Sequence, residues 1–362
     1  MGLLGKINRS QTSFLLVLAI AGLLNFHHHS VVAQEAFILA ENPPEKEFKT
    51  FPSWSRLNLV HSLKQPKTVI SSLLFSPDSK ILISGGSNNP ELVFWSVAKG
   101  KKLTETRAQR TAVLTMAISP DGKTLISGGK DSGLNLWDWQ TGKYLATFLE
   151  HTTSITSLAI SPDGKVLVSG GLDGIKVWDL KAHPQRPMYT LADIGNLTNV
   201  VAISPNGYLV ASGDDKGKVS FWNLRTGVKI SEFSPHKDLI SGLVFSPDGE
   251  TLITASQDSQ IKLWDLGSGQ LLHTFTRHRD GVRAIALNPQ GTVLASGGND
   301  GIMLWDLTKG RLLTRIRDHR NWVQSLAFSP DGNYLASGGY DFTVKIWQNI
   351  EEENTANLDR SE

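Results

Sequence analysis

The sequence consists of seven copies of one unit, and this repeat restricts the fold more than any other feature does. The clearest copy is Phe245–Leu266, FSPDGETLITASQDSQIKLWDL. In each copy a Ser-Pro or Asn-Pro turn follows one apolar run, and a tryptophan lies at the end of a later one. These tryptophans are 41 to 44 residues apart, at Trp95, Trp137, Trp178, Trp222, Trp264, Trp305 and Trp347. The repeat therefore predicts seven similar supersecondary units in a row.

The residues within each unit predict short β-strands. Ile261–Trp264 alternates apolar and polar side chains, as a half-buried strand does. The Pro-Asp-Gly sequence favours a tight hairpin, because Pro presets φ, Asp bonds back to the backbone and Gly takes a positive φ. A single four-stranded sheet cannot bury both of its faces, whereas a closed ring of stacked sheets can. We therefore expect an all-β fold made of seven four-stranded sheets around one axis.

A Trp-Asp pair ends the third predicted strand in four of the units. The pairs are Trp137-Asp138, Trp178-Asp179, Trp264-Asp265 and Trp305-Asp306, and they become Trp95-Ser96, Trp222-Asn223 and Trp347-Gln348 elsewhere. With a period of about 40–45 residues, these pairs make the chain resemble the WD40 repeat family from about Leu57 to Asn349. The resemblance implies one seven-bladed β-propeller over residues 57–350, a fold whose faces hold protein or peptide partners.

The number of predicted strands indicates how the ring closes. After Trp347 only a few residues precede the acidic tail, so the last unit lacks a fourth strand. One unpaired strand, Leu57–Leu63, precedes the first unit and matches the fourth strands Lys229–Phe233 and Leu271–Phe275. We expect this N-terminal strand to complete the last blade, as the resemblance also implies. Phe51 and Trp54 are expected to pack beside it.

Four units share a set of polar residues in addition to the tryptophan. The sets are His151, Ser169, Asp173 and Trp178; His236, Thr254, Asp258 and Trp264; His278, Ser296, Asp300 and Trp305; and His319, Ser337, Asp341 and Trp347. The residue types match a Ser-His-Asp catalytic triad. In the WD40 family the same set is a buried network from Asp through His and Ser/Thr to the indole N–H. Four copies fit that structural role, whereas a hydrolase needs one triad beside one pocket.

The other three units depart from this pattern. The first has Asn88-Asn89-Pro90 at the Asp position and no His. The second has Gln109 at the His position, and the fourth has Ile194 there, with Lys216 at the Asp position. We expect these three blades to be held together by other contacts.

The loops show no nucleophile elbow, no phosphate-binding glycine loop and no zinc motif. Glycine pairs such as Gly85-Gly86, Gly128-Gly129 and Gly297-Gly298 are interpreted as tight turns at strand ends. The predicted function is a non-catalytic protein–protein interaction platform without metal or small-molecule cofactor, acting as a monomer within a larger assembly. The alternative is an exported propeller enzyme, lactonase-like or glycan-cleaving, that uses the mouth of the central channel.

One group of residues is predicted to bind the partner. Trp322 and Tyr340 are large aromatic residues that the repeat does not require, and in the WD40 family both positions open on one face. Leu239, Arg279 and Arg320 are expected nearby. Exposed Trp, Tyr and Arg dominate the energetics of protein interfaces. The alternative is that Trp322 packs under a neighbouring loop, because tryptophan is usually largely buried.

The N-terminus predicts export. Lys6 and Arg9 precede the apolar run Phe14–Leu24, which is too short to span a bilayer but suits a secretory signal. Cleavage after Ala33 makes residues 1–33 a signal peptide and 34–56 a linker, and residues 351–362 are expected to be a disordered acidic tail. The alternative is a membrane anchor formed by residues 14–24. The mature chain is close to neutral, which argues against nucleic acid as a partner.

Overall fold

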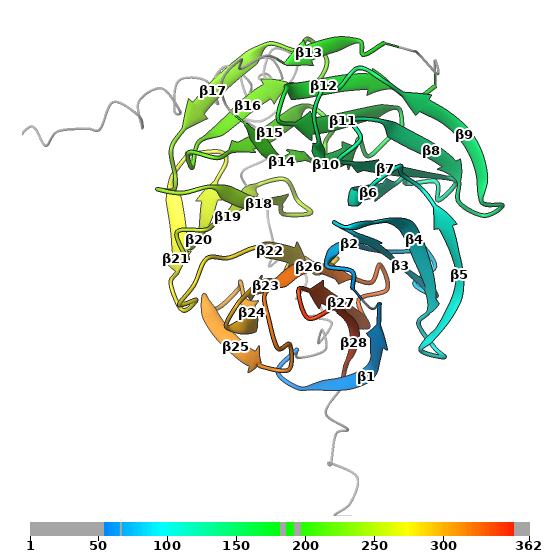
Figure 1. The fold of residues 1–362 in the computed structure, drawn as a ribbon. Helices are drawn as coiled ribbons and strands as arrows, with labels where there is room; N and C mark the ends of the chain where they lie inside the picture. The colour runs from blue at the N-terminus through cyan, green and yellow to red at the C-terminus, as the bar shows by residue number, and fades with distance from the viewer. Residues whose placement is uncertain (1–53, 66, 182–185, 192–196, 351–362) are drawn as a thin grey trace, which may run out of the picture.

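The computed structural model describes residues 54–65, 67–181, 186–191 and 197–350. These residues form seven four-stranded antiparallel sheets, arranged as blades around a central axis (Figure 1). The predicted all-β, seven-bladed propeller is confirmed. No helix within the described ranges has both the length and the apolar character that crossing a membrane requires.

Each blade runs from an innermost strand beside the axis to an outer strand at the rim, and the blades are numbered 1 to 7 in the order of their innermost strands (Figure 1). The innermost strands are β2 (Ile70–Phe75), β6 (Val113–Ile118), β10 (Ile155–Ile160), β14 (Thr198–Ile203), β18 (Ile240–Phe245), β22 (Ala284–Leu287) and β26 (Val323–Phe328). The second strands are β3 (Ile81–Gly86), β7 (Thr124–Gly129), β11 (Val166–Gly171), β15 (Leu209–Asp214), β19 (Thr251–Ser256), β23 (Val293–Gly298) and β27 (Tyr334–Gly339). The third strands are β4 (Asn89–Ser96), β8 (Leu134–Asp138), β12 (Gly174–Asp179), β16 (Val219–Asn223), β20 (Ile261–Asp265), β24 (Gly301–Asp306) and β28 (Thr343–Asn349). The outer strands are β5 (Lys101–Arg107), β9 (Lys143–Phe148), β13 (Tyr189–Leu191), β17 (Lys229–Phe233), β21 (Leu271–Phe275), β25 (Arg311–Ile316) and, in blade 7, β1 (Leu57–Lys64).

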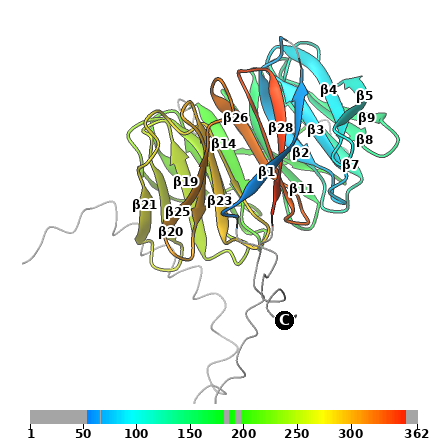
Figure 2. The ribbon, with the colours of Figure 1, turned by 90° about the horizontal axis from the view of Figure 1, so that it is seen from below.

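Blade 7 contains strands from both ends of the chain. The N-terminal β1 pairs with β28 in antiparallel register, from Leu57 opposite Asn349 to Lys64 opposite Thr343, and the two strands lie side by side in both views (Figures 1 and 2). The predicted closure by an N-terminal strand is therefore confirmed. Trp54 precedes β1 and is only 2% exposed, with its ring 4.8 Å from that of Phe328 in an edge-on arrangement. Phe51 lies outside the described residues.

The hydrophobic core lies between the blades. Each of the seven interfaces between neighbouring blades has its own cluster of buried apolar side chains. The cluster between blades 7 and 1 joins Val344 and Ile346 of β28 to Ile70 and Trp95 of blade 1. Because every blade buries both faces against its neighbours, the ring stays whole only while all seven interfaces are closed.

The glycine pairs at the ends of the second strands are not tight turns, so that interpretation was wrong. Gly85, Gly128 and Gly297 lie within β3, β7 and β23 and do not have a positive φ. A Cβ on Gly85 would lie 2.6 Å from the side chain of Val113 in the next blade. These glycines therefore let the first inner residue of one blade approach the sheet of its neighbour.

The ring has two faces, which Figure 2 shows from the side. We call upper the face that carries the loops leading into the innermost strands and the loops between second and third strands. The lower face carries the Ser-Pro turns, in which the Ser76 hydroxyl, for example, donates to Asp78 at 2.6 Å and accepts from the N–H of Ile81 at 3.0 Å. The first of these turns has Ser79 at φ 59° where others have glycine, and its hydroxyl accepts a bond from Asp331 N–H across the closing interface.

Candidate functional site

The four predicted sets of His, Ser or Thr, Asp and Trp form continuous hydrogen-bonded chains, which we call the histidine tetrads. In blade 3, His151 Nδ1 lies 2.6 Å from Asp173 Oδ1, and its Nε2 lies 2.7 Å from Ser169 Oγ. The Trp178 indole N–H donates to the same Oγ at 2.8 Å. Each tetrad thus links the loop before an innermost strand to the second and third strands of the same blade.

The other three tetrads have the same order. The His–Asp distance is 3.0 Å in blade 5, 2.7 Å in blade 6 and 2.9 Å in blade 7. The His–Ser/Thr distance is 2.8, 2.7 and 2.7 Å in the same three blades. The Trp–Ser/Thr distance is 3.2, 2.8 and 2.8 Å. Blade 6 adds an ion pair, because Arg315 Nη2 lies 2.8 Å from the Asp300 carboxylate. The chain therefore repeats one polar network four times, with only local additions.

Burial governs the protonation of the tetrads in blades 3 and 5. It lowers the pKa of His151 and His236, and the neighbouring carboxylates oppose that shift only in part, so the imidazoles are neutral. Burial acts to raise the pKa of Asp173 and Asp258, but the imidazole and the backbone N–H groups that each carboxylate binds outweigh it and hold the pKa below its ordinary value. A neutral imidazole then donates from Nδ1 to Asp and accepts at Nε2 from the hydroxyl.

The tetrad hydroxyls are closed to substrates. Ser169, Thr254, Ser296 and Ser337 are all 0% exposed, and each accepts the indole N–H of its blade. A nucleophile has to reach the atom it attacks, and these oxygens meet only their own blade. In this arrangement the tetrads connect and rigidify blades rather than perform acyl transfer.

Two of the remaining blades use glutamine where the tetrads use histidine. In blade 2, Gln109 Nε2 donates to Ser127 Oγ at 3.1 Å, as the sequence position predicted. In blade 1, Gln65 accepts from Ser84 Oγ at 2.9 Å, and Trp95 donates to the same oxygen at 2.8 Å. Gln65 was missed because it stands eleven residues before its Ser-Pro turn, one more than the histidines do. The loop between Gln65 and β2 is one residue longer than its equivalents, so the spacing within the repeat does not point to Gln65.

In blade 4 the buried Trp222 still donates to Ser212 at 3.0 Å. Ile194, at the predicted His position, lies outside the described residues. Asp214 accepts the N–H groups of Lys216 and Lys218 at 2.9 and 2.8 Å, so it stabilises its own turn. In blade 4, a carboxylate that caps its own turn therefore takes the place of the tetrad Asp.

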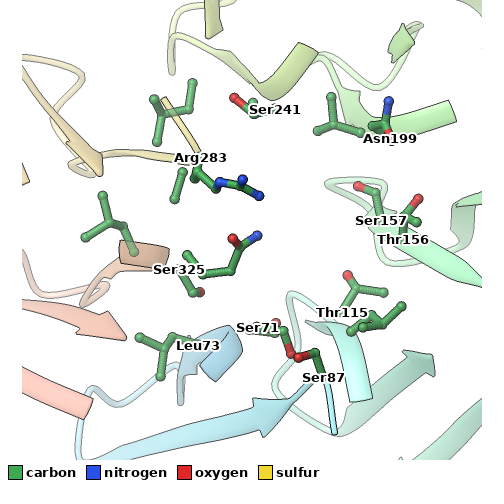
Figure 3. Close-up of a pocket in the computed structure, with 18 of the residues that line it drawn as sticks. Ser71, Leu73, Ser87, Thr115, Thr156, Ser157, Asn199, Ser241, Arg283 and Ser325 are labelled. Atoms are coloured by element: carbon green, nitrogen blue, oxygen red, sulfur yellow. The ribbon is translucent and has the colours of Figure 1, made fainter. Parts of the chain in front are cut away.

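A central channel opens on the upper face. Its cavity measures about 540 Å³ and is lined by the innermost strands of all seven blades. Most of the polar lining consists of hydroxyl and amide side chains, several of which Figure 3 shows around the open centre. Among the lining residues, Arg283 alone is charged, and its guanidinium points into the middle of the ring (Figure 3).

β-Bulges place the side chains that line the channel. In β2 the register shifts between Ile70 and Ser72, which leaves Ser71 without a partner residue on β3, and β6, β10, β14, β18 and β26 shift at the same point. A bulge redirects the extra side chain. Measured back from the Ser-Pro or Asn-Pro turn, the seven equivalent residues are Ser71, Leu114, Thr156, Asn199, Ser241, Arg283 and Gln324, and all of them line the cavity.

Three of these seven residues bond neighbouring blades together. Ser71 Oγ donates to the carbonyl of Val113 at 2.6 Å, and Ser241 Oγ donates to that of Val282 at 2.6 Å. Thr156 makes the equivalent bond in blade 3 at 2.9 Å. Blades 1, 3 and 5 are thus fixed to blades 2, 4 and 6 at the channel wall.

The structure does not bring the predicted partner-binding residues into one hollow of the upper face. Tyr340, 38% exposed, and the half-buried Leu239 both line the channel mouth. Arg279 lines a shallow groove of about 370 Å³ over blades 6 and 7, and Arg320 is exposed but lines neither hollow. Trp322 is half-buried, and its carbonyl accepts the Tyr340 N–H at 2.9 Å.

The neighbour of Trp322 was not among the predicted residues. The Arg283 guanidinium carbon lies 4.6 Å from the centre of the Trp322 ring. A guanidinium over an indole face is attracted by the ring quadrupole and is held in a fixed orientation. One face of Trp322 is therefore covered by the side chain of Arg283, which lies in the loop just before β22 of blade 6. Comparing the bulge positions across the seven units would have singled out Arg283 as the one charged residue.

The described part of the chain contains no group of three or more His, Asp or Glu side chains arranged to hold a metal ion. The carboxylates of the tetrads are bonded to imidazole and backbone N–H groups. This upper face offers a ligand an open channel, one inward cation and the exposed side chain of Tyr340.

The comparison with curated proteins found no match. The family model described as WD40: WD domain, G-beta repeat matches residues 57–96, 100–138, 142–179, 186–223, 227–265, 269–306 and 310–348. The first match begins with β1, and each match ends at the third strand of a blade, so the repeat in sequence is offset by one strand from the blade in space. WD40 propellers typically serve as protein-interaction platforms. Because the seven matches together cover more than half of the chain, the protein belongs to the WD40 family.

Proposed function

We propose that this protein is a non-catalytic platform that holds a protein or peptide partner on its upper face, at the mouth of the channel. The observation that supports this proposal is that Tyr340 and Leu239 line an open mouth, with the half-buried Trp322 hydrogen-bonded to Tyr340 through the backbone and exposed arginines nearby. Aromatic and arginine side chains of this kind supply most of the binding energy in protein interfaces. We propose that the ring acts as a monomer within a larger assembly and needs no small-molecule cofactor.

Replacing either aromatic residue tests the proposal. Trp322→Ala and Tyr340→Ala are each expected to weaken partner binding by about 1–4 kcal/mol, because both remove a large contact surface near the centre of the face. The measurement is quantitative capture of partners by the immobilised ring, with thermal melting of each variant alongside.

Tyr208→Ala is the matched control. Tyr208 is 64% exposed and follows a Ser-Pro turn on the lower face. Tyr208→Ala should leave the capture of partners unchanged. If Trp322→Ala captured the same partners as the wild type, or melted far earlier than Tyr340→Ala, the indole would belong to the blade interface and not to a binding face.

We also propose that the protein is exported, to the cell envelope or beyond it. The support is the sequence alone, since residues 1–53 lie outside the described ranges. Sequencing the N-terminus of the protein isolated from its host should give a chain that begins at Gln34. A cytosolic pool that retains Met1 would contradict export. A chain that retains residues 14–24 and sediments with membranes would indicate an anchor instead of a cleaved signal.

A further inference from the structure

The channel contains a cation without a carboxylate partner among the described residues. The Arg283 guanidinium makes no ion pair with any side chain of the described residues, and its Nε, although buried, has no hydrogen-bond acceptor. A buried donor without a partner is unfavourable, and a charged one more so. Arg315, on the outer strand β25 of the same blade, shows the usual arrangement, because it is paired with Asp300 at 2.8 Å.

The surroundings of Arg283 hold it ready for a ligand. Trp322 supports one face of the guanidinium at 4.6 Å, so the fork of N–H groups has a defined plane. Such a planar fork matches carboxylate and phosphoryl oxygens, to which it donates two parallel hydrogen bonds. In Figure 3 this fork faces the open centre of the channel and not the wall.

Three hydroxyl side chains of the channel wall do not compete for that role. The hydroxyls of Ser71, Thr156 and Ser241 donate their protons to the next blade, so toward the channel they present acceptor oxygens only. Gln324, on the next blade, has a buried amide oxygen without a partner. This oxygen can accept a hydrogen bond from a donor group beside the anion. The strongest donor that faces the cavity is therefore the guanidinium of Arg283.

The charge at the rim extends this preference outward. Arg279, Arg317 and Arg320 lie in the loops over blades 6 and 7 and are exposed. The exposed acids in these loops are Asp280 and Asp318. Asp318 is already paired with Lys345. An anionic segment that approached over blades 6 and 7 would thus meet more basic than acidic side chains before it reached the channel.

From this geometry we infer that Arg283 is the anchor for an oxyanion on the partner: a carboxylate or phosphoryl side chain of a peptide segment enters the upper mouth and binds the guanidinium. Tyr340 and Leu239 line the same mouth and contact the flanking residues. This inference rests on the proposed function and adds to it the chemistry of the partner, which is an anionic peptide.

The experiment uses random dodecapeptides displayed on phage and selected on the immobilised full chain. Wild-type protein is expected to enrich peptides with Asp or Glu at a fixed position. Arg283→Gln should remove that enrichment. Synthetic peptides from the selection should then bind Arg283→Gln about tenfold to a hundredfold more weakly by fluorescence anisotropy, the loss expected for a charge-assisted bond.

Arg225→Gln is the matched control, because it makes the same change of charge at an exposed turn of the lower face. It should bind the selected peptides as the wild type does, and Arg283→Lys should retain part of the affinity. Each variant is also melted, and Arg283→Gln is expected to be no less stable than wild type, since it removes an unpartnered charge. Binding by Arg283→Gln at wild-type strength would overturn the inference.

The outcomes separate this inference from the function on which it rests. Peptides that need Trp322 and Tyr340 but carry no acidic residue would leave the binding platform standing and refute the oxyanion anchor. Selection that enriches nothing on the wild type would refute both. The two sources of the anion are distinguished with one peptide made in three forms, with Glu, phosphoserine or Gln at the anchor. The first two should bind tighter than the third, and the tighter of them identifies the natural anion.

Discussion

A chain that begins at Gln65 is expected to lose the soluble, monomeric ring that a chain beginning at Trp54 keeps. The shorter chain lacks β1 and Trp54, and so leaves β28 as an open edge with Val344, Ile346 and Trp347 uncovered. Exposed apolar edge strands pair with other chains, and the burial of one leucine such as Leu63 is worth about 1.5–3 kcal/mol. The measurement is size-exclusion chromatography with thermal melting of both truncated chains.

The two truncations differ only in the closing strand, because both lack residues 1–53. Any difference between them therefore reports β1 and the tryptophan before it. A monomeric chain from Gln65 with the melting temperature of the longer one would mean that the ring closes without strand exchange at blade 7.

Asp258→Ala is expected to destabilise the fold by about 1–3 kcal/mol, measured by urea unfolding. The carboxylate accepts from His236 Nδ1 at 3.0 Å and from the N–H groups of Lys237 and Gln260 at 3.1 and 3.0 Å. His236 is 5% exposed, so the substitution leaves a buried imidazole N–H without an acceptor. The penalty of such an orphaned donor is the reason for the large effect.

Asp138→Ala provides the comparison at the Asp of a Trp-Asp pair. Asp138 accepts the N–H of Thr141 at 2.8 Å in a turn on the lower face, where water can replace it. Its loss is expected to destabilise the protein less than Asp258→Ala does. Equal effects would show that the tetrad carboxylate is not the more important of the two.

The fold was predictable because each of the seven repeats indicates the same four-stranded blade. Seven tryptophans in register specify seven sheets, and the missing fourth strand after Trp347 specifies that Leu57–Leu63 returns to blade 7. The tetrads were predictable for the same reason, since in all four the Ser or Thr follows the His by 18 residues and the Asp follows it by 22. The agreement between the copies resolves what a single unit would leave ambiguous.

The lining of the channel was not predictable in the same way. Strict alternation assigns each inner-strand residue to one face of its sheet, but the bulge at Ser71 and its equivalents breaks that alternation. Arg283 also meets Trp322 only when blades 6 and 7 lie side by side, although 39 residues separate them in the chain. Contacts between blades follow from ring closure, which no local pattern describes.

Both ends of the described ring meet at one point. The Ile350 N–H donates to the Arg56 carbonyl at 3.2 Å, and Asn349 bonds to Asn333 just after the Ser-Pro turn of blade 7, so this point lies on the lower face. A tag, linker or support joined directly to Trp54 or to Ile350 would therefore attach at blade 7, with the channel mouth turned away from it. Rings immobilised at these residues would all display the same face to solution and present Trp322 and Tyr340 outward.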